Sequence, residues 1–191
     1  MTQTPRPCRS VLYIPADKPR ALDKARTLPC DVIIFDLEDA VAPDAKEDAR
    51  VTLRDELRKG GFGGRQKLVR VNGFDTHWGR QDLLALGDED FDAVLIPKVN
   101  SGWEVEAAAE LVEEKDLWAM METPQAFMNA CEIASHSRMK GLVMGTNDLA
   151  KDLGCRNRAD RLPLMLSLQM CVLAARSAQI PAIDGVYNAF K

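Results

Sequence analysis

Two acidic residues, Glu122 and Asp148, stand close behind two apolar segments of the chain. Glu122 follows residues 117–121, and Asp148 comes just beyond the apolar run 142–144 and Gly145. A carboxylate beside a hydrophobic core is costly unless something binds it. Magnesium takes one or two protein carboxylates and keeps waters that a substrate can displace. The spacing favours a shared metal site, and the alternative is that Asp148 only caps the helix that begins there.

The other residue types that bind metals narrow the choice of ion. The chain contains only two histidines, His77 and His136, and its five scattered cysteines form no Cys-x-x-Cys pair. This excludes a three-histidine zinc site and leaves no thiolate pair to replace it. Oxygen ligands favour Mg²⁺, with Mn²⁺ as the alternative ion.

Three further groups could bind an anionic substrate. Arg70 carries a planar guanidinium that suits a carboxylate or a phosphate, and its alternative role is a structural ion pair with Asp36 or Glu38. Lys18 and Arg20 follow the first apolar segment and bring positive charge to the start of a helix. They could hold a phosphate there, although basic residues on a surface are common.

These residues can meet only if the apolar segments end at a common edge. The sequence predicts strands at residues 10–14, 31–37, 67–71, 93–96, 117–121, 142–144 and 182–186. It predicts helices between them, at residues 19–27, 43–59, 76–85, 102–114, 124–134 and 159–179, the last being the longest. Strands that alternate with helices over short links are typical of parallel strands with right-handed crossovers.

The predicted fold class is α/β, a TIM (β/α)8-type barrel apparently truncated after the seventh strand. Residues 1–191 are expected to form a single (β/α) barrel domain that lacks the usual eighth strand and C-terminal segment, because such barrels typically need about 250 residues. A doubly wound sheet is the competing architecture, but no Gly-x-Gly-x-x-Gly turn follows any predicted strand. An open barrel edge would expose unpaired backbone groups, which predicts either a homo-oligomer that covers this edge or a barrel that closes poorly.

In a parallel barrel the chemistry gathers at the carboxyl ends of the strands. The polar residues at those ends are Asp36, Glu38, Asp39, Arg70, Asn72, Lys98, Glu122, Asp148 and Asp184. Each of them alone has a structural alternative as a cap, a rim charge or a loop ion pair. The whole set, drawn from six predicted strands, favours a functional site.

The bulk composition restricts the class of protein. With 191 residues and 46% hydrophobic content, the chain can build one sizeable core. Its net charge of -4 gives no reason to expect nucleic acid or an anionic membrane as a partner. No apolar run reaches membrane-spanning length. The odd, scattered cysteines fit a reduced cytoplasm better than a disulfide framework.

Seven short motifs occur in order along the chain. They are Leu12-Tyr-Ile-Pro-Ala-Asp-Lys-Pro-Arg20, Asp36-Leu-Glu-Asp-Ala-Val41 followed by Lys46 and Ala49-Arg50, Val69-Arg-Val-Asn72, Ile96-Pro-Lys-Val99, Glu122-Thr-Pro124, Gly145-Thr-Asn-Asp-Leu-Ala150 and Ala182-Ile-Asp-Gly-Val-Tyr187. Together they resemble the citrate lyase beta subunit family, part of the HpcH/HpaI aldolase group that includes malyl-CoA lyases. Each motif is weak alone, but the ordered set is specific and spans residues 9–188.

The resemblance implies a magnesium-dependent lyase. It implies that a carbon–carbon bond is broken or formed in a 3-hydroxyacyl-CoA thioester of the citryl-CoA, malyl-CoA or citramalyl-CoA type, giving an acetyl-CoA-type product and a 2-oxo acid. Carried over by motif, Glu122 and Asp148 are the metal ligands. Arg70 holds the carboxylate or acyl end of the substrate. Asp36 and Glu38 steer metal-bound water.

The resemblance also implies partners. The loop from Pro15 to Arg20, with Lys18 and Arg20, resembles the segment near the coenzyme A phosphates. Acyl-carrier or lyase-complex subunits are further expected partners.

Two alternative functions stay open. One is a non-catalytic subunit that binds coenzyme A or a 2-oxo acid, and the other is a magnesium enzyme that acts on free 2-oxo acids.

Overall fold

The computed structural model describes residues 8–112 and 114–188. These residues form two compact units that divide between Val94 and Leu95. The first unit holds β1 (Val11–Pro15), α1 (Pro19–Ala25), β2 (Val32–Asp36), η1 (Pro43–Ala45), α2 (Lys46–Lys59), β3 (Gln66–Arg70) and α3 (His77–Leu86). The second unit holds α4 (Gly102–Leu111), β5 (Asp116–Met121), α5 (Pro124–Met128), α6 (Ala130–Ala134), β6 (Met139–Met144), α7 (Thr146–Asp152), η2 (Leu162–Leu164), α8 (Met165–Ser177) and β7 (Ala182–Ile183). Strand β4 (Ala93–Ile96) crosses the division.

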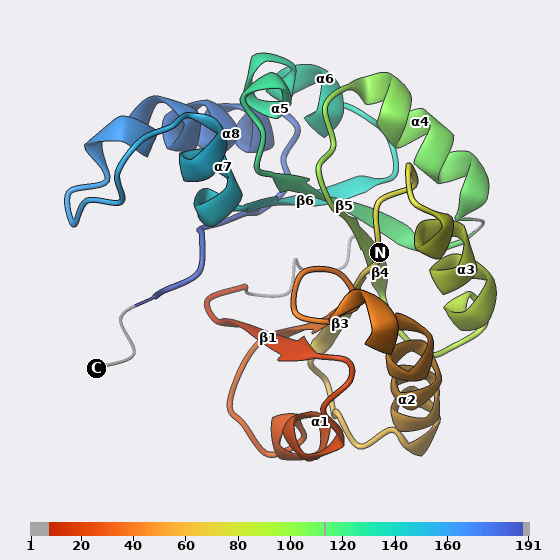
Figure 1. Ribbon diagram of the computed structural model, residues 1–191. Coiled ribbons are helices and arrows are strands. Elements are labelled where there is room, and N and C mark those ends of the chain that lie inside the picture. Colours follow the sequence, from red (N-terminus) through yellow and green to blue (C-terminus); the bar gives the residue numbers. More distant parts are fainter. Residues whose placement is uncertain (1–7, 113, 189–191) are drawn as a thin grey trace. The chain divides into compact units, whose positions relative to one another are not determined.

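In the first unit, strands β1, β2 and β3 pair in parallel and in sequence order. Every residue of β2 is buried, as expected for a parallel strand that is covered on both faces. Helices α1 and α2 pack against each other beside these strands (Figure 1). Asp36, the last residue of β2, is paired in register with Pro15 of β1 and with Arg70 of β3. The first unit therefore gathers the ends of three strands at one edge.

In the second unit, β6 pairs in parallel with β5 on one side and with β7 on the other. Helices α6 and α8 pack against each other and against β6, as Figure 1 shows. The ends of β5 and β6 are level, because Met121 is paired with Met144 and the Gly145 N–H donates to the Met121 carbonyl at 3.0 Å. This register sets Glu122 beside the turn that leads into α7.

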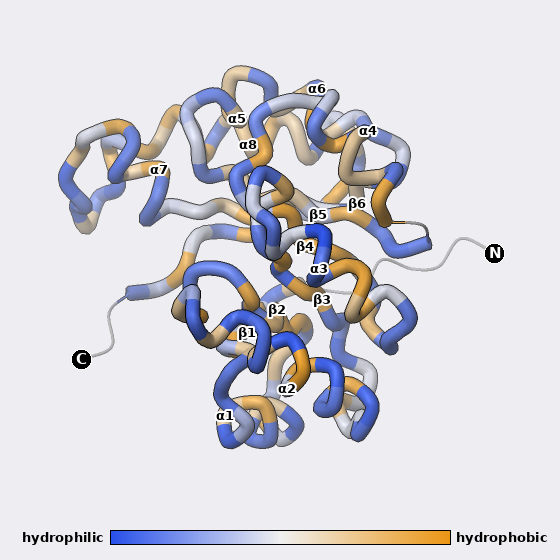
Figure 2. The backbone as a smooth tube through the Cα atoms, turned by 45° about the vertical axis from the view of Figure 1, so that its right-hand side comes forward, coloured by the Kyte–Doolittle hydropathy of each residue, from blue (hydrophilic) through white to orange (hydrophobic). Residues whose placement is uncertain are grey.

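Hydropathy differs between the elements of the first unit. Figure 2 shows hydrophobic colour along β2, and α2 mixes hydrophilic and hydrophobic segments. Helix α2 buries Ala49, Leu53 and Leu57, a spacing of four residues that keeps one face of the helix on the core. Among the residues that the structure describes, no helix is long and apolar enough to cross a membrane.

The predicted α/β class is confirmed, and β4 has the predicted bounds. The single barrel, and its truncation after the seventh strand, stay predictions. The predicted helix 102–114 ends at Leu111, and residue 113 lies outside the described ranges. The predicted helix 124–134 was wrong as a single element. Asn129, with φ −108° and ψ 16°, separates α5 from α6, and its side-chain amide donates to the Asn100 carbonyl at 2.7 Å.

Two predictions near the C-terminal end were also wrong. Helix α8 begins at Met165, preceded by η2, because Arg161 adopts a left-handed conformation (φ +54°) just before that turn. With 13 residues α8 is shorter than α2, which has 14. Strand β7 ends at Ile183, because the Asp184 carboxylate pairs with Arg161 and accepts the Gly185 N–H, which turns the chain.

A glycine inside β6 leaves room for a tryptophan of β5. A Cβ at Gly141 would lie 2.3 Å from the ring of Trp118, which is buried. Gly141→Ala is therefore expected to overpack this site and to lower the free energy of unfolding by about 1–3 kcal/mol. Urea denaturation measures the loss. The control is Gly64→Ala, where no heavy atom of the described residues lies within 4 Å of the new Cβ. Equal stability of the two variants would contradict the prediction.

Candidate active site

The carboxylate of Asp36 and the guanidinium of Arg70 form a buried ion pair in the first unit. Arg70 Nε donates to Asp36 Oδ1 at 2.8 Å, and Nη2 donates to Oδ2 at 2.5 Å. The two residues are paired in register on β2 and β3, so the sheet itself sets this geometry. Bidentate pairs of this kind combine two charge-assisted hydrogen bonds.

Further acidic side chains surround the same guanidinium. Arg70 Nη1 lies 3.1 Å from Glu38 Oε2 and 3.6 Å from Asp39 Oδ2, and the Tyr13 ring centroid lies 5.5 Å from the Arg70 Cζ. Burial alone would lower the pKa of Arg70. The hydrogen bonds and charge of Asp36, with the charge of Glu38, outweigh burial and raise that pKa above its ordinary value. The ion pair with Asp36 and Glu38 predicted as one alternative is therefore present, and a role in substrate binding stays a prediction.

A second set of buried polar residues holds the turn that follows β2. Lys46 Nζ donates to the carbonyls of Leu37 and Glu38, both at 2.9 Å. Asn72 Nδ2 donates to the Leu37 carbonyl at 3.0 Å and to Asp82 Oδ2 at 2.8 Å. Burial lowers the pKa of Lys46, and the charge of Glu38 opposes that shift. This network fixes the backbone from which Glu38 projects.

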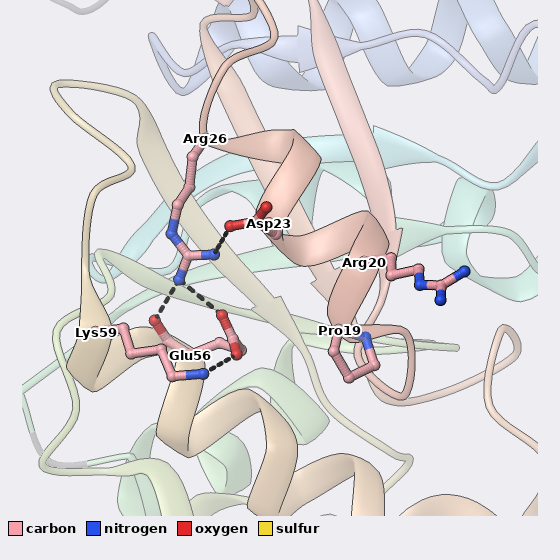
Figure 3. A pocket seen from close by; sticks show the side chains of 6 residues that line it. All are labelled: Pro19, Arg20, Asp23, Arg26, Glu56 and Lys59. Atoms are coloured by element: carbon pink, nitrogen blue, oxygen red, sulfur yellow. Dashed lines mark hydrogen bonds and ion pairs between the residues drawn. The ribbon is translucent and has the colours of Figure 1, made fainter.

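Lys18 and Arg20, the residues predicted to meet phosphate, are both exposed at the start of α1. Lys18 forms an ion pair with Asp17. Arg20 lines an open pocket of about 430 Å³ whose other lining residues are Pro19, Asp23, Arg26, Glu56 and Lys59. Figure 3 shows Arg26 and Lys59 directed at Glu56, while the Arg20 guanidinium points away from that cluster.

In the second unit, Glu122 lies directly after β5 and is only 2% exposed. Its Oε1 accepts the backbone N–H of Lys98 at 2.8 Å. Its Oε2 faces Gly145, because a Cβ at residue 145 would lie 2.5 Å from that oxygen and 2.4 Å from the Glu122 Cβ. Only glycine at position 145 allows the Glu122 side chain to pack this closely against the backbone of the turn.

Asp148 lies in the first turn of α7, three residues beyond Gly145, and is partly buried. The backbone at this turn is tied to the strand ends, since Leu149 N–H donates to the Gly145 carbonyl at 3.1 Å. Gly145 is the N-cap residue, and no side chain in the described part of the chain forms a capping hydrogen bond at this helix. The alternative that Asp148 serves as the helix cap is therefore not what the structure shows.

The residues around Glu122 fit a magnesium ion. A buried carboxylate packs against the Gly145 turn, and a second carboxylate stands in the first turn of the adjoining helix. Within residues 8–112 and 114–188, no group of three or more His, Cys, Asp or Glu could hold a metal ion. Magnesium needs only one or two protein carboxylates, with the remaining positions taken by water and substrate. The assignment of Glu122 and Asp148 as ligands stays a prediction.

Three further residues hold predicted site residues or their neighbours in place through hydrogen bonds, and none of them was identified as a site residue from the sequence. They are Asn100, Thr123 and Asp82. Thr123 caps α5, and the following Pro124 is a signal that could have found it. Asp82 is fully buried and accepts from Arg50 and Asn72, but its place in a charged helical segment gives no such signal. Lys98 was noted as a polar residue at a strand end, and its backbone N–H donates to Glu122.

Comparison with known proteins adds sequence relatives. The HpcH/HpaI aldolase/citrate lyase family profile matches residues 9–191. The chain is 56% identical over 191 residues to a (3S)-malyl-CoA thioesterase of Cereibacter sphaeroides (strain KD131 / KCTC 12085), covering 100% of this chain and 67% of that protein. It is 30% identical over 192 residues to the citrate lyase subunit beta of Escherichia coli (strain K12), covering 94% and 64%. The chain spans about two thirds of the length of these relatives.

Solved structures are similar over nearly the whole chain. The citrate lyase beta subunit of M. tuberculosis, complexed with oxaloacetate and magnesium, gives a TM-score of 0.80 at 32% identity over 94% of this chain and 78% of that one. The protein CitE from Mycobacterium tuberculosis, in complex with magnesium, acetoacetate and coenzyme A, gives 0.83 at 32% identity over 97% and 68%. These values show that the fold is shared.

Proposed function

Because the chain belongs to the HpcH/HpaI aldolase/citrate lyase family, we propose that it is a magnesium-dependent enzyme acting on the coenzyme A thioester of a 3-hydroxy acid of the malyl-CoA type. The observation that carries the proposal is the buried Glu122 carboxylate facing the Gly145 turn, with Asp148 in the turn that follows. The 56% identity to a malyl-CoA thioesterase supports the substrate class. The solved relatives with magnesium, and one with coenzyme A, support the cofactor and the thioester.

Each site residue has a role in this proposal. Glu122 and Asp148 would hold magnesium, which supplies Lewis-acid polarisation of the substrate oxygens when bound. Arg70 would bind a substrate carboxylate through Nη1, which pairs with Glu38 in this structure, while its Nε and Nη2 donate to Asp36. Glu38, held by the network around its backbone, would orient water.

Two exposed basic residues at the start of α1, Lys18 and Arg20, would bind the coenzyme A part of the thioester substrate. Arg20 is exposed at the start of α1, and its guanidinium points away from the Arg26–Glu56 pair (Figure 3). Lys18 stands two residues before it. These two cations would bind the phosphates of coenzyme A, and this binding would weaken as salt is added.

Two reactions on this substrate have support. Hydrolysis adds water across the thioester and releases free coenzyme A and the hydroxy acid, and it is favoured by the 56% identical relative. Carbon–carbon cleavage removes the hydroxyl proton, breaks the bond between C2 and C3 of the acyl group, and returns a proton to C2, which gives an acetyl-CoA-type product and a 2-oxo acid. Cleavage is the reaction expected from the sequence, and the 30% identical citrate lyase subunit beta supports it. We rank hydrolysis first for this chain, because its relative is much more similar.

Turnover assays separate these reactions. The purified chain with Mg²⁺ is expected to convert malyl-CoA, and a thiol reagent would detect free coenzyme A if hydrolysis occurs. A carbonyl reagent would instead detect a 2-oxo acid if the carbon–carbon bond breaks. Citryl-CoA, citramalyl-CoA and the free hydroxy acids are tested in parallel, with EDTA and then Mg²⁺ or Mn²⁺ restored as the metal control.

Three outcomes would contradict the proposal. Turnover that survives EDTA would remove the metal. Turnover of free acids alone would favour a magnesium enzyme without coenzyme A. Calorimetric binding of acetyl-CoA without turnover of any thioester would favour a non-catalytic subunit. A homo-oligomer and acyl-carrier or lyase-complex partners stay predictions, which sedimentation and co-purification can test.

A further inference from the structure

The loop after β4 contains an unusual backbone conformation. Lys98 has a φ of +52°, although it is not a glycine. Residues with a Cβ rarely adopt this left-handed region, because the side chain crowds the following carbonyl. Such a conformation persists when the surrounding structure determines it, and it is found disproportionately at functional sites. The hydrogen bonds of this loop indicate which side chain the turn at Lys98 positions.

The left-handed turn at Lys98 aims a backbone donor at the proposed metal ligand. The Lys98 N–H donates to Glu122 Oε1 at 2.8 Å, and Glu122 is almost fully buried. A hydrogen bond from a backbone N–H to a buried carboxylate is charge-assisted and directional. It fixes the rotation of the carboxylate, so that the other oxygen, Oε2, lies against Gly145 at the start of the turn that carries Asp148.

The Asn100 side chain holds this turn in place. Asn100 Nδ2 donates to the Lys98 carbonyl at 2.9 Å, and Asn100 Oδ1 accepts the hydroxyl of Thr123 at 2.6 Å. The Asn100 carbonyl accepts Asn129 Nδ2 at 2.7 Å. Thr123 is the residue after Glu122, so the Asn100 side chain bridges the loop after β4 to the chain next to the carboxylate.

The start of α4 does not depend on the Asn100 side chain. The N-cap residue is Ser101, whose hydroxyl accepts the Glu104 N–H at 3.2 Å. The Glu104 carboxylate in turn accepts the backbone N–H of Asn100 at 2.6 Å. This arrangement resembles a capping box, which satisfies the helix terminus by itself. The side-chain bonds of Asn100 are thus directed at Lys98 and Thr123 rather than at the helix.

We propose that Asn100 is a positioning residue that, by holding the left-handed turn at Lys98, orients Glu122 to bind a divalent cation. The inference rests on the proposed function for the identity of the cation. The positioning of Glu122 itself rests only on the hydrogen bonds between Asn100, Lys98 and Glu122.

The test compares Asn100→Ala with the unsubstituted chain. Loss of the bridge is expected to weaken Mn²⁺ binding, measured by calorimetry, by about tenfold, and to speed hydrogen exchange at the Lys98 amide by about tenfold, as expected for the loss of one hydrogen bond. The matched control is Asn157→Ala, at an exposed asparagine, which should change neither quantity.

A second variant separates positioning from general loss of stability. Glycine adopts positive φ readily, so adding Lys98→Gly to Asn100→Ala should restore much of the Mn²⁺ affinity. The backbone N–H that donates to Glu122 is kept in this double variant. A role limited to supporting the loop would show recovered stability without recovered metal affinity, which would overturn the proposal.

The remaining outcomes are also distinguishable. Unchanged Mn²⁺ affinity and unchanged Lys98 exchange in Asn100→Ala would overturn the positioning role, while the proposed function would stand. If the unsubstituted chain bound no Mn²⁺ or Mg²⁺, the proposed function would fail. Faster Lys98 exchange in Asn100→Ala would still support the orientation of Glu122 in that case.

Discussion

Glu122→Gln is expected to lower magnesium-dependent turnover by about a thousandfold. A bound ion that polarises the substrate contributes several kcal/mol to transition-state stabilisation, and each 1.36 kcal/mol is about tenfold in rate. Glutamine replaces one charged oxygen by an amide nitrogen, which cannot bind a cation. The affinity for Mn²⁺ should fall together with the rate.

The fold of this variant should be preserved. The glutamine carbonyl oxygen can still accept the Lys98 N–H that Glu122 Oε1 accepts now. Glu122 is only 2% exposed, and an uncharged side chain is easier to bury than a charged one. The free energy of unfolding without metal is therefore expected to be equal or higher. Circular dichroism and urea denaturation measure it beside the kinetics.

A carboxylate outside the site provides the control. Glu110 is exposed on α4, and Glu110→Gln should leave turnover and Mn²⁺ binding unchanged. Asp148→Asn should resemble Glu122→Gln in both quantities, because both carboxylates are assigned to one ion. Full turnover in either of the two site variants would remove that residue from the metal site.

Periodicity and turn residues predicted most of the fold, since they act locally. The apolar runs gave the strands, and the prolines at 19, 43 and 124 marked starts of helical segments. The break at Asn129 was missed because its cause is a contact with Asn100, far away in the sequence. The end of β7 depends in the same way on the pairing of Asp184 with Arg161.

The site was predictable to the extent that strand ends gather polar residues. Asp36, Arg70 and Glu122 lie at or directly after strand ends, as expected. The pairing of Arg70 with Asp36 could be proposed from charge, but its bidentate geometry follows from the register of β2 and β3. The hydrogen bond from the Lys98 backbone N–H could not be predicted, because the residue type does not indicate that a lysine adopts a left-handed backbone conformation.

Arg70→Met is expected to lower the free energy of unfolding by about 3–5 kcal/mol. Removing one partner of a buried ion pair leaves the other charge without compensation, and here Asp36 is 2% exposed. Arg70→Lys should have a free energy of unfolding between those of the unsubstituted chain and Arg70→Met, because one ammonium keeps the charge but cannot reproduce the two hydrogen bonds of the guanidinium. Urea denaturation at neutral pH measures all three proteins.

The double variant Asp36→Asn with Arg70→Met separates the two roles of the arginine. Arg70→Met leaves two buried carboxylates, Asp36 and Glu38, without this cation. The added Asp36→Asn removes the charge of the one that accepts two guanidinium hydrogen bonds, so part of the lost stability should return. If Arg70 also binds the substrate carboxylate, turnover should stay low in this stable protein, and the KM for the thioester should rise. Recovery of both stability and turnover would mean that Arg70 serves the fold alone. Recovery of stability without turnover is the result we expect, because methionine at position 70 offers no cation to the substrate carboxylate.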